Sequence, residues 1–519
     1  MPPSSIVIAG ATGFVGQAVA RRLAGRTTDR LTITGLTRGR TGATGAWDRL
    51  VTCDLFSLKD VEQALVGARY VAYLVHSMLP SARLVQGRFE DLDLICADNV
   101  GRAAAKAGVE QIVYLGGLIP PAEDTQLSTH LASRREVEAA LGAHGVPVTT
   151  LRAGLVIGPH GSSFEILTRL VRRLPVMILP RWTAQRCQPI DLDTTAQLID
   201  AVIGDPATFG ATCDIGGPDV LRYRDMMTVV GEEMGTPRKQ LGVPVLTPRL
   251  SQRWVSLVTG APSALVAPLV DSLRHDMVCR DRALQARLGL PGVPFRIAVR
   301  AALAAEAARA AAGTATATAA GTVAGTVAAP AAGTVAAPAP APATAVAPAP
   351  APALTPARST TPVAYQAAPP STSTGVRSVQ RIPLPPGRDA EWAAHEYMRW
   401  LPRGVWPFLR VHVDDARRCT FFFAGIRRPL LVLEFAKDRS ASDRQLFYVT
   451  GGLLARPTKR GRLEFRVTPD GQHLLTAIHE FEPRLPWFLY RQTQARVHAW
   501  VMRQFGKHLA RVARGAARG

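Results

Sequence analysis

The chain has 519 residues, which is enough for two or three domains with sizeable cores. Its formal net charge of +21 comes mostly from dispersed arginines, without a basic block or a basic–aromatic alternation, so no nucleic-acid partner is expected. Six cysteines lie far apart without Cys-x-x-Cys spacing, which predicts free thiols in a reducing cytoplasm and neither a metal site nor disulfides. No signal peptide is expected, because the first apolar run already serves the motif described next.

A glycine-rich turn near the start separates a short apolar run from a helical pattern. Residues 5–9 predict a buried strand, and glycines follow at positions 10, 13 and 16. In this context Gly10 permits the tight turn, Gly13 the close approach of a pyrophosphate, and Gly16 the packing of the helix. The helix N-terminus offers free N–H groups to phosphates. The alternative is a turn without a ligand. The predicted dinucleotide contacts are Gly10, Thr12, Gly13, Phe14, Val15 and Gly16.

Residues 1–215 alternate short apolar runs with helical patterns. This spacing predicts right-handed strand–helix–strand crossovers and a doubly wound parallel sheet, whose ligand binds at the carboxyl ends of the strands. The predicted strands are 5–9, Leu31–Leu36, Leu50–Asp54, Tyr70–Val75, Gln111–Leu115, Val148–Val156 and Thr212–Ile215. The predicted helices are Val15–Leu23, Leu58–Leu65, Leu84–Lys106 and Leu131–Leu141.

A smaller, mainly helical lobe is expected to complete the first domain, residues 1–312, and to cover a small apolar substrate or a lipid. Trp254–Val270 in this lobe carries no charge but is short for a membrane span. It is interpreted as core or as a surface helix pair, with peripheral contact at the inner membrane face of a cytoplasmic protein as the alternative. Other helical patterns are Phe164–Leu174, Thr194–Ile203 and the alanine-rich Phe295–Ala312.

Residues 313–375 form a predicted linker, and residues 376–519 a second domain. The linker repeats Gly-Thr-Val-Ala and Ala-Pro, which favours extended polyproline II and leaves the geometry of the two units unfixed. The second domain is predicted to be α+β, with an antiparallel sheet that grips a long amphipathic helix, Leu485–Val512, and can enclose an apolar cavity. Its other predicted elements are a helix at Ala390–Trp400 and strands at Phe408–Val413, Cys419–Phe423, Leu430–Phe435, Leu446–Gly451, Arg462–Val467 and Leu474–Phe481.

The second predicted strand ends in arginines instead of the acid that usually holds the adenosine ribose of NAD. Arg38 and Arg40 suit bidentate pairing with a 2′-phosphate, so NADP(H) is favoured over NAD(H), the alternative being two solvated arginines. Asp54, followed by Leu55, ends the third strand, where its carboxylate would reach the adenine amine or belong to a helix N-cap region. His76 ends the fourth strand, where a nicotinamide would lie.

Together these motifs resemble the extended and atypical branches of the short-chain dehydrogenase/reductase superfamily. The glycine turn, the Asp54-Leu55 pair, Asn99 and the strand end Val113–Gly117 carry the resemblance. Over about residues 4–300 the chain is similar to bacterial NmrA-like NAD(P)H-binding proteins, related to the NADPH-binding accessory subunit of respiratory complex I. The resemblance implies a Rossmann fold and dinucleotide binding. Residues 376–519 are similar in strand order to the helix-grip, START-like superfamily, which implies an apolar or lipid ligand.

Catalytic members of the superfamily carry a serine at the end of the fifth strand and Tyr-x-x-x-Lys on the next helix, where the tyrosine transfers a proton. Here the strand ends in two glycines and the helix carries His130-x-x-x-Arg134. The catalytic candidates are therefore His130, as a proton relay, and Arg134, as a ribose or phosphate ligand. Two functions stay open: an NADP(H)-dependent oxidoreductase with a nonstandard proton donor, or a non-catalytic NADPH-binding sensor, regulator or assembly factor.

Overall fold

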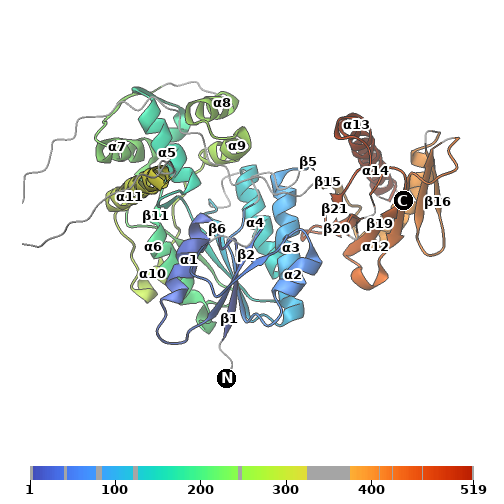
Figure 1. Cartoon of the computed structure of the whole chain (residues 1–519), viewed down its shortest axis with the longest axis horizontal. Helices are drawn as coiled ribbons and strands as arrows, with labels where there is room; N and C mark the ends of the chain where they lie inside the picture. Colours follow the sequence, from blue (N-terminus) through green and yellow to red (C-terminus); the bar gives the residue numbers. More distant parts are fainter. Residues whose placement is uncertain are drawn as a thin grey trace, which may run out of the picture.

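The computed structural model describes residues 4–39, 44–76, 84–120, 127–242, 248–323, 375–407, 409–423, 425–456, 458 and 460–516. An α/β unit comes first, and an α+β unit with its own sheet follows (Figure 1). Residues 324–374 of the predicted linker lie outside the described residues, whereas residues 313–323 continue the helix α11 (Phe295–Val323).

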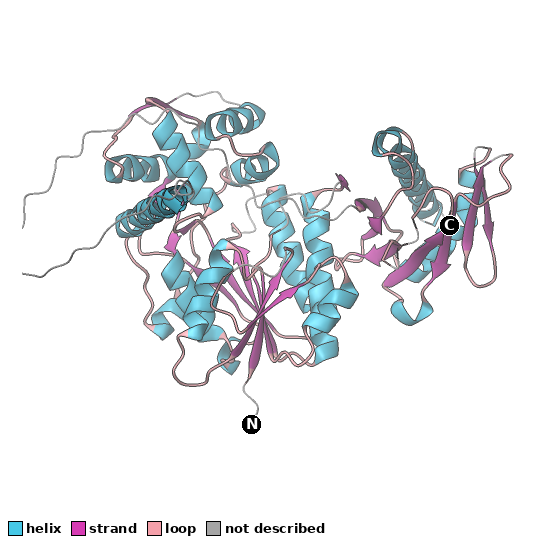
Figure 2. Ribbon diagram, viewed as in Figure 1, coloured by secondary structure: helices cyan, strands magenta, loops and turns pink. Residues whose placement is uncertain are grey.

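A parallel sheet of seven strands forms the centre of the first unit (Figure 2). Its order is β12-β7-β6-β4-β1-β2-β3, and each neighbouring pair is parallel, which confirms the predicted doubly wound sheet. The strand order reverses between β1 and β4, which is where such sheets open a ligand crevice. The strands are β1 (Ser5–Ala9), β2 (Thr32–Thr37), β3 (Arg49–Thr52), β4 (Tyr70–Tyr73), β6 (Gln111–Gly117), β7 (Val148–Ala153) and β12 (Thr212–Ile215).

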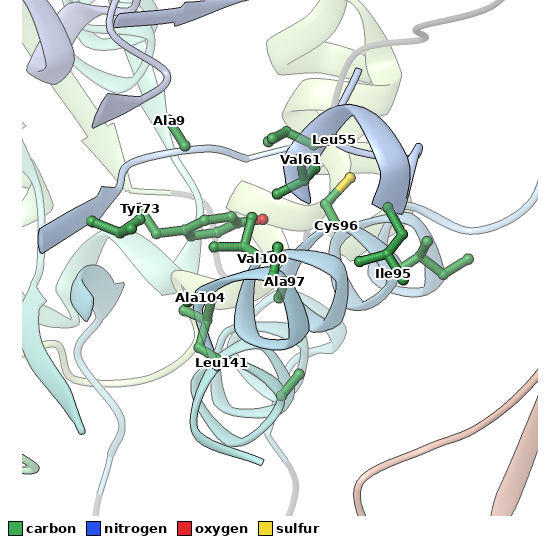
Figure 3. Close-up of a cluster of buried hydrophobic side chains, with 14 of the residues drawn as sticks. Ala9, Leu55, Val61, Tyr73, Ile95, Cys96, Ala97, Val100, Ala104 and Leu141 are labelled. Carbon is green, nitrogen blue, oxygen red and sulfur yellow. The ribbon is translucent and has the colours of Figure 1, made fainter. Parts of the chain in front are cut away.

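Helices cover both faces of this sheet. On one face, apolar side chains of α2, α3 and α4 pack against β1 and β4, and Figure 3 shows Ala97 and Val100 of α3 beside Tyr73 of β4. Helices α1 and α6 bury the opposite face. Removal of this apolar surface from water is the main force that holds the layers together. The helices are α1 (Phe14–Ala24), α2 (Leu58–Ala64), α3 (Phe89–Ala107), α4 (Thr129–Gly142) and α6 (Leu192–Val202).

The lobe sits at the carboxyl edge of the sheet and is mainly helical, as predicted. Trp254–Val270 lies in the packed helix pair α8 and α9, and no described helix is long and apolar enough to cross a membrane. The lobe helices are α5 (Ser162–Arg173), α7 (Tyr223–Glu233), α8 (Pro248–Thr259), α9 (Ser263–Ser272), α10 (Ala283–Leu288) and α11. Short strand pairs join β8 (Val156–Ile157) to β11 (Ile190–Asp191), β9 (Val176–Leu179) to β14 (Lys239–Gly242), and β10 (Arg186–Cys187) to β13 (Leu221–Arg222).

The second unit contains the predicted antiparallel sheet and a long C-terminal helix. The predicted helix Leu485–Val512 is two helices, interrupted at Thr493, whose hydroxyl donates to the carbonyl of Leu489 at 2.6 Å. The sheet order is β16-β17-β18-β19-β20-β21-β15-β5. Its elements are β15 (Val376–Pro383), α12 (Ala390–Gly404), β16 (Leu409–Val413), β17 (Cys419–Phe423), β18 (Leu431–Phe435), β19 (Arg444–Gly451), β20 (Arg462–Val467), β21 (His473–Phe481), α13 (Trp487–Gln492) and α14 (Gln494–Ala516).

The last strand of that sheet, β5 (Leu84–Gln86), comes from the first unit, where the sequence predicted the beginning of a helix. The predicted helix Leu84–Lys106 is wrong for its first residues, because residues 84–86 form a strand that pairs in parallel with Val376–Ser378 of β15. A Cβ atom on the next residue, Gly87, would lie 3.2 Å from Val379, so glycine permits the two backbones to approach. Helix α3 therefore begins only at Phe89.

Direct contacts between described residues join the two units. Val379, Leu475 and Ala477 of the second sheet belong to the same buried cluster as the side chains of α3. Buried Arg466 donates to Oδ1 of Asn99 at 2.7 Å and pairs with Asp98. Four more arginines of the second unit pair with acids of the first. The pairs are Arg377–Asp54, Arg381–Asp91 and Arg381–Glu136, Arg439–Glu62, and Arg460–Asp60.

Candidate active site

A cavity of about 500 Å³ runs from the glycine turn into the lobe, at the carboxyl edge of the central sheet. One end is bordered by the turn and by the ends of β4 and β6, and the other by apolar side chains of α8 and α9. The cavity thus joins a polar end to an apolar end. Among its lining residues are Gly13, Phe14, Val15, Gly16, Arg38, His76, Gly116, Gly117, His130, Arg134, Trp182, Tyr223, Val255, Val266, Leu269 and Val270.

The glycine turn has the geometry that a phosphate-binding turn needs. Gly10 has a φ of +89°, and its carbonyl accepts the N–H of Gly13 at 2.9 Å. A Cβ atom on Gly16 would lie 2.1 Å from the same carbonyl, so only glycine fits there. Gly13 forms the N-cap of α1 without a side-chain cap, and it borders the cavity, so the first N–H groups of the helix face space that a pyrophosphate fits.

The structure brings eight of the predicted site residues to one cavity. Gly10 and Thr12 belong to the turn but do not line the cavity. Asp54 and Leu55 also lie off it, and Arg40 is outside the described residues. The eight that line the cavity are Gly13, Phe14, Val15, Gly16, Arg38, His76, His130 and Arg134.

Asp54 and Leu55 both contact the junction of the two units. Oδ2 of Asp54 accepts from the guanidinium of Arg377 at 2.8 Å, and its Oδ1 accepts the N–H of Phe56 at 3.2 Å. The carbonyl of Leu55 accepts from the Asn99 side chain at 2.9 Å. In this arrangement the Asp54 carboxylate is held by the second unit.

A group of polar side chains lies buried beside the cavity, between β4, β6, α3 and α4. Nδ1 of His76 lies 2.6 Å from Oδ2 of Asp93, and the rings of His76 and His130 are 5.0 Å apart between centroids. Arg134 donates to the hydroxyl of Tyr114 at 3.3 Å. Among the described residues, Nε2 of His76 and Nδ1 of His130 have no hydrogen-bond partner although both atoms are buried. Such atoms are suited to meet a ligand.

Burial has the largest effect on the pKa of each of these two histidines. It lowers the pKa of His76, with the positive charge of Arg134 acting in the same direction and Asp93 opposing. It lowers the pKa of His130 well below its ordinary value, helped by His76 and Arg134. Both rings are therefore neutral at pH 7. Because Asp93 engages Nδ1 of His76, the tautomer with a free electron pair on Nε2 is favoured, which is the state of a proton acceptor.

Neither Asp93 nor the lobe residues that line the cavity were predicted from the sequence. One sequence feature could have indicated Asp93. It is an acidic residue on the buried face of α3, four residues before the buried Ala97, where an apolar residue is expected. Ser128, near His130, caps α4 by accepting the N–H of Leu131 at 3.3 Å, which is a structural role. Among the described residues no three or more His, Cys, Asp or Glu side chains form a group that could hold a metal ion.

Comparison with known proteins relates part of the chain to a family. The model of the NAD dependent epimerase/dehydratase family matches residues 6–186. Auxiliary protein GraX of Staphylococcus aureus is 27% identical over 160 residues, which is 28% of this chain and 42% of that protein. The chain thus spans less than half the length of this relative. The segment 6–186 is related to NAD(P)-binding proteins of that family, which agrees with the expected superfamily at this coarser level.

Solved structures also resemble the chain. A nucleoside-diphosphate-sugar epimerase from Staphylococcus aureus is 16% identical with a TM-score of 0.46, over 57% of this chain and 99% of its own. The triphenylmethane reductase of Citrobacter sp. is 18% identical with a TM-score of 0.46, over 58% and 99%. An NADPH-dependent quinone oxidoreductase from Escherichia coli is 19% identical with a TM-score of 0.45, over 57% and 98%. Similarity at this level carries no information about activity.

Proposed function

We propose that the first unit is an oxidoreductase that binds NADP(H) and reduces a small apolar substrate. The observation that carries this proposal is the continuity of one cavity of about 500 Å³, which joins the glycine turn and Arg38 to the apolar wall formed by α8 and α9. A cofactor held at the turn and a substrate held in the lobe would then meet beside His76. The family match over residues 6–186 supports the dinucleotide part of the proposal.

The residues present fit the cofactor. The uncapped N-terminus of α1 and the bare backbone at Gly13 would hold its pyrophosphate, and Arg38 a 2′-phosphate. Arg134 lies on the cavity wall and would hold a ribose or phosphate oxygen. When bound, the nicotinamide supplies a hydride, and the protein supplies orientation and electrostatics.

For the proton, we consider His76 and His130 on the cavity wall, because burial raises the pKa of Tyr223, which also lines the cavity, well above its ordinary value. His76 is held in one orientation by Asp93 and keeps Nε2 for the cavity, whereas Nδ1 of His130 has no partner among the described residues. In a reduction, His76 would take up a proton from water at Nε2, and the Asp93 carboxylate would stabilise the imidazolium that forms. The imidazolium would then donate this proton to the substrate that receives the hydride. His130 would serve beside it as a relay.

A calorimetric titration of the purified, nucleotide-stripped protein with NADPH and with NADH tests the cofactor. We expect tighter binding of NADPH and a loss of that preference in Arg38→Ala. Continuous NADPH consumption with a panel of quinones, aldehydes and enones then tests the reaction. Binding of neither nucleotide would refute the proposal.

The second candidate function is a non-catalytic NADPH-binding sensor, regulator or assembly factor. It is favoured by the replacement of the usual Tyr-x-x-x-Lys by His130-x-x-x-Arg134. It is also favoured by burial, which lowers the pKa of both histidines and so disfavours the imidazolium that would serve as proton donor. Intact NADPH binding with no turnover over the whole panel would select this function.

We also propose that the second unit takes a small apolar ligand between its sheet and α14, as its similarity to helix-grip proteins implies. A cavity of about 130 Å³ lies there, bordered by apolar side chains and by His498 and Gln494. Uptake of a fluorescent fatty acid by the delipidated full chain, blocked by Val501→Trp, would support this; no uptake would refute it.

A further inference from the structure

We propose that one end of the second unit docks on an anionic lipid surface, through apolar side chains that stand among arginines. This docking face consists of the turn after α12, the turn between β17 and β18, the segment after β19, and the segment that leads through α13. Figure 1 shows α13 at one end of the unit, away from the first sheet. The proposal concerns a surface that plays no part in the cofactor site.

Backbone hydrogen bonds show that these four segments lie together. Leu409, after α12, is paired with Phe423 at the end of β17. The N–H of Leu453 donates to the carbonyl of Pro429 in the β17–β18 turn at 3.0 Å. The N–H of Arg484 donates to the carbonyl of Leu454 at 3.1 Å, which joins the segment before α13 to the same end of the sheet. The docking face is therefore one continuous region.

Large apolar side chains of this face are exposed to an unusual degree. Phe488 on α13 is 70% exposed and Trp406 is 62% exposed. Exposed apolar groups scattered singly need no explanation, but a group at one end of a unit marks a contact surface. The exposed apolar side chains are Trp406, Phe423, Ile426, Leu453, Phe488 and Leu489.

Six arginines of the docking face lie among these apolar side chains. Each of the six is exposed, and none has an ion-pair partner among the described residues, although most other arginines of the second unit do. Arg410 also lies over the ring of Trp406, at 6.0 Å from its centroid. The carboxylate that adjoins the face, Glu482, is only partly exposed. The arginines are Arg410, Arg427, Arg428, Arg456, Arg484 and Arg491.

The combination suits a bilayer surface better than other anionic partners. Aromatic and aliphatic side chains enter the boundary between headgroups and acyl chains, while arginines contact anionic headgroups. A nucleic acid supplies phosphates but does not favour burial of Ile426, Leu453 and Leu489. The apolar side chains come from separate turns and do not form one groove. A fluid bilayer interface can bury such side chains without a rigid surface of complementary shape. The face also surrounds the end of the 130 Å³ cavity at which Leu409, Leu430 and Leu454 lie.

Co-sedimentation of the full-length protein with vesicles tests the proposal. Vesicles of phosphatidylcholine alone are compared with vesicles that contain one quarter phosphatidylglycerol. We expect binding to the anionic vesicles only, weakened by raising the salt, because screening reduces surface electrostatics. Arg427→Gln/Arg428→Gln should weaken binding roughly tenfold or more, since each arginine near an anionic surface contributes about fivefold. Phe488→Ser/Leu489→Ser should weaken it by a similar factor.

Matched controls separate this face from other surfaces. Leu257→Ser removes an apolar side chain that is 82% exposed on α8 of the lobe, and Arg135→Gln/Arg172→Gln removes two exposed arginines of the first unit. Neither should change vesicle binding. Absence of binding to anionic vesicles, or equal losses in the controls, would overturn the proposal. So would binding of a DNA oligonucleotide that depends on Arg427 and Arg428, with vesicle binding insensitive to Phe488 and Leu489.

Discussion

Nδ1 of His76 lies 2.6 Å from Oδ2 of Asp93 on the wall of the cavity, and Nε2 of the same ring has no partner among the described residues. The pair joins the segment that follows β4 to the N-terminal half of α3. The Asp93 carboxylate thus holds one nitrogen of a histidine that lines the cavity. That relationship gives the site its most specific chemical prediction.

Asp93→Asn should lower the pKa of His76 further, because the carboxylate that favours the imidazolium is removed. The His76 ring signal in an NMR pH titration measures this directly. If the protein turns over NADPH, the same variant should reduce kcat about 10- to 100-fold with little change in NADPH affinity. Asp48→Asn, at an exposed pair, is the control. An unchanged His76 titration would contradict the assigned contact.

Gly16→Ala should destabilise the first unit and weaken NADPH binding more than tenfold. The added Cβ atom would stand 2.1 Å from the carbonyl of Gly10, so the turn or the helix must move. Such overpacking costs about 1–3 kcal/mol. Gly142→Ala is the matched control, because the nearest atom to its Cβ would be 3.5 Å away. Chemical unfolding and calorimetry with NADPH measure the two effects; full NADPH affinity in Gly16→Ala would contradict the predicted role of the turn.

Arg466→Met should lower the free energy of unfolding by roughly 3–5 kcal/mol, because it leaves Asp98 and Glu464 buried without their shared partner. Arg460→Met removes a largely exposed arginine at the same junction and should cost less than about 1 kcal/mol. Urea unfolding followed in both units is the measurement. We expect Arg466→Met to separate one transition into two, since the junction holds the units together. Equal effects of the two variants would argue against a buried ionic junction.

The second unit should lose stability as the pH falls from about 6.5 to about 4. Burial lowers the pKa of His498 from 6.5 to about 4, so in this window the unfolded chain binds a proton that the folded chain does not. The stability is complete above pH 6.5 and declines by roughly 1–3 kcal/mol as the pH approaches the folded pKa. His498→Leu should flatten this part of the pH profile. An identical slope in the variant, measured by thermal unfolding, would refute the assignment.

Much of the fold followed from local patterns. The strands Thr212–Ile215, Cys419–Phe423 and Arg462–Val467 have the predicted bounds, because period-two alternation and flanking turn residues act within a few positions. The glycine turn was predictable for the same reason, since its chemistry is contained in seven consecutive residues. The strand β15 was not predicted, because its sequence mixes polar and apolar residues without a clear alternation and follows directly on the linker.

The candidate site was predictable only in part. His76, His130 and Arg38 were found, because each follows a recognisable strand or replaces a residue of a known motif. Asp93 was not, because its role depends on a contact with a residue 17 positions earlier, across the boundary of strand and helix. The apolar wall from α8 and α9 was expected only as a lobe, since which side chains face the cavity depends on how the helices pack.

Local patterns were enough to predict two units of different class, a dinucleotide-type turn and the absence of the usual catalytic tyrosine and lysine, because each of these features lies within adjacent residues. The position of the second unit against the first depends instead on long-range contacts. Leu84–Gln86 becomes a strand by pairing with residues about 290 positions later, and Asp54 is engaged by Arg377. No local pattern encodes such partners, because their free energy arises from burial and charge pairing between segments that meet only when both units are folded.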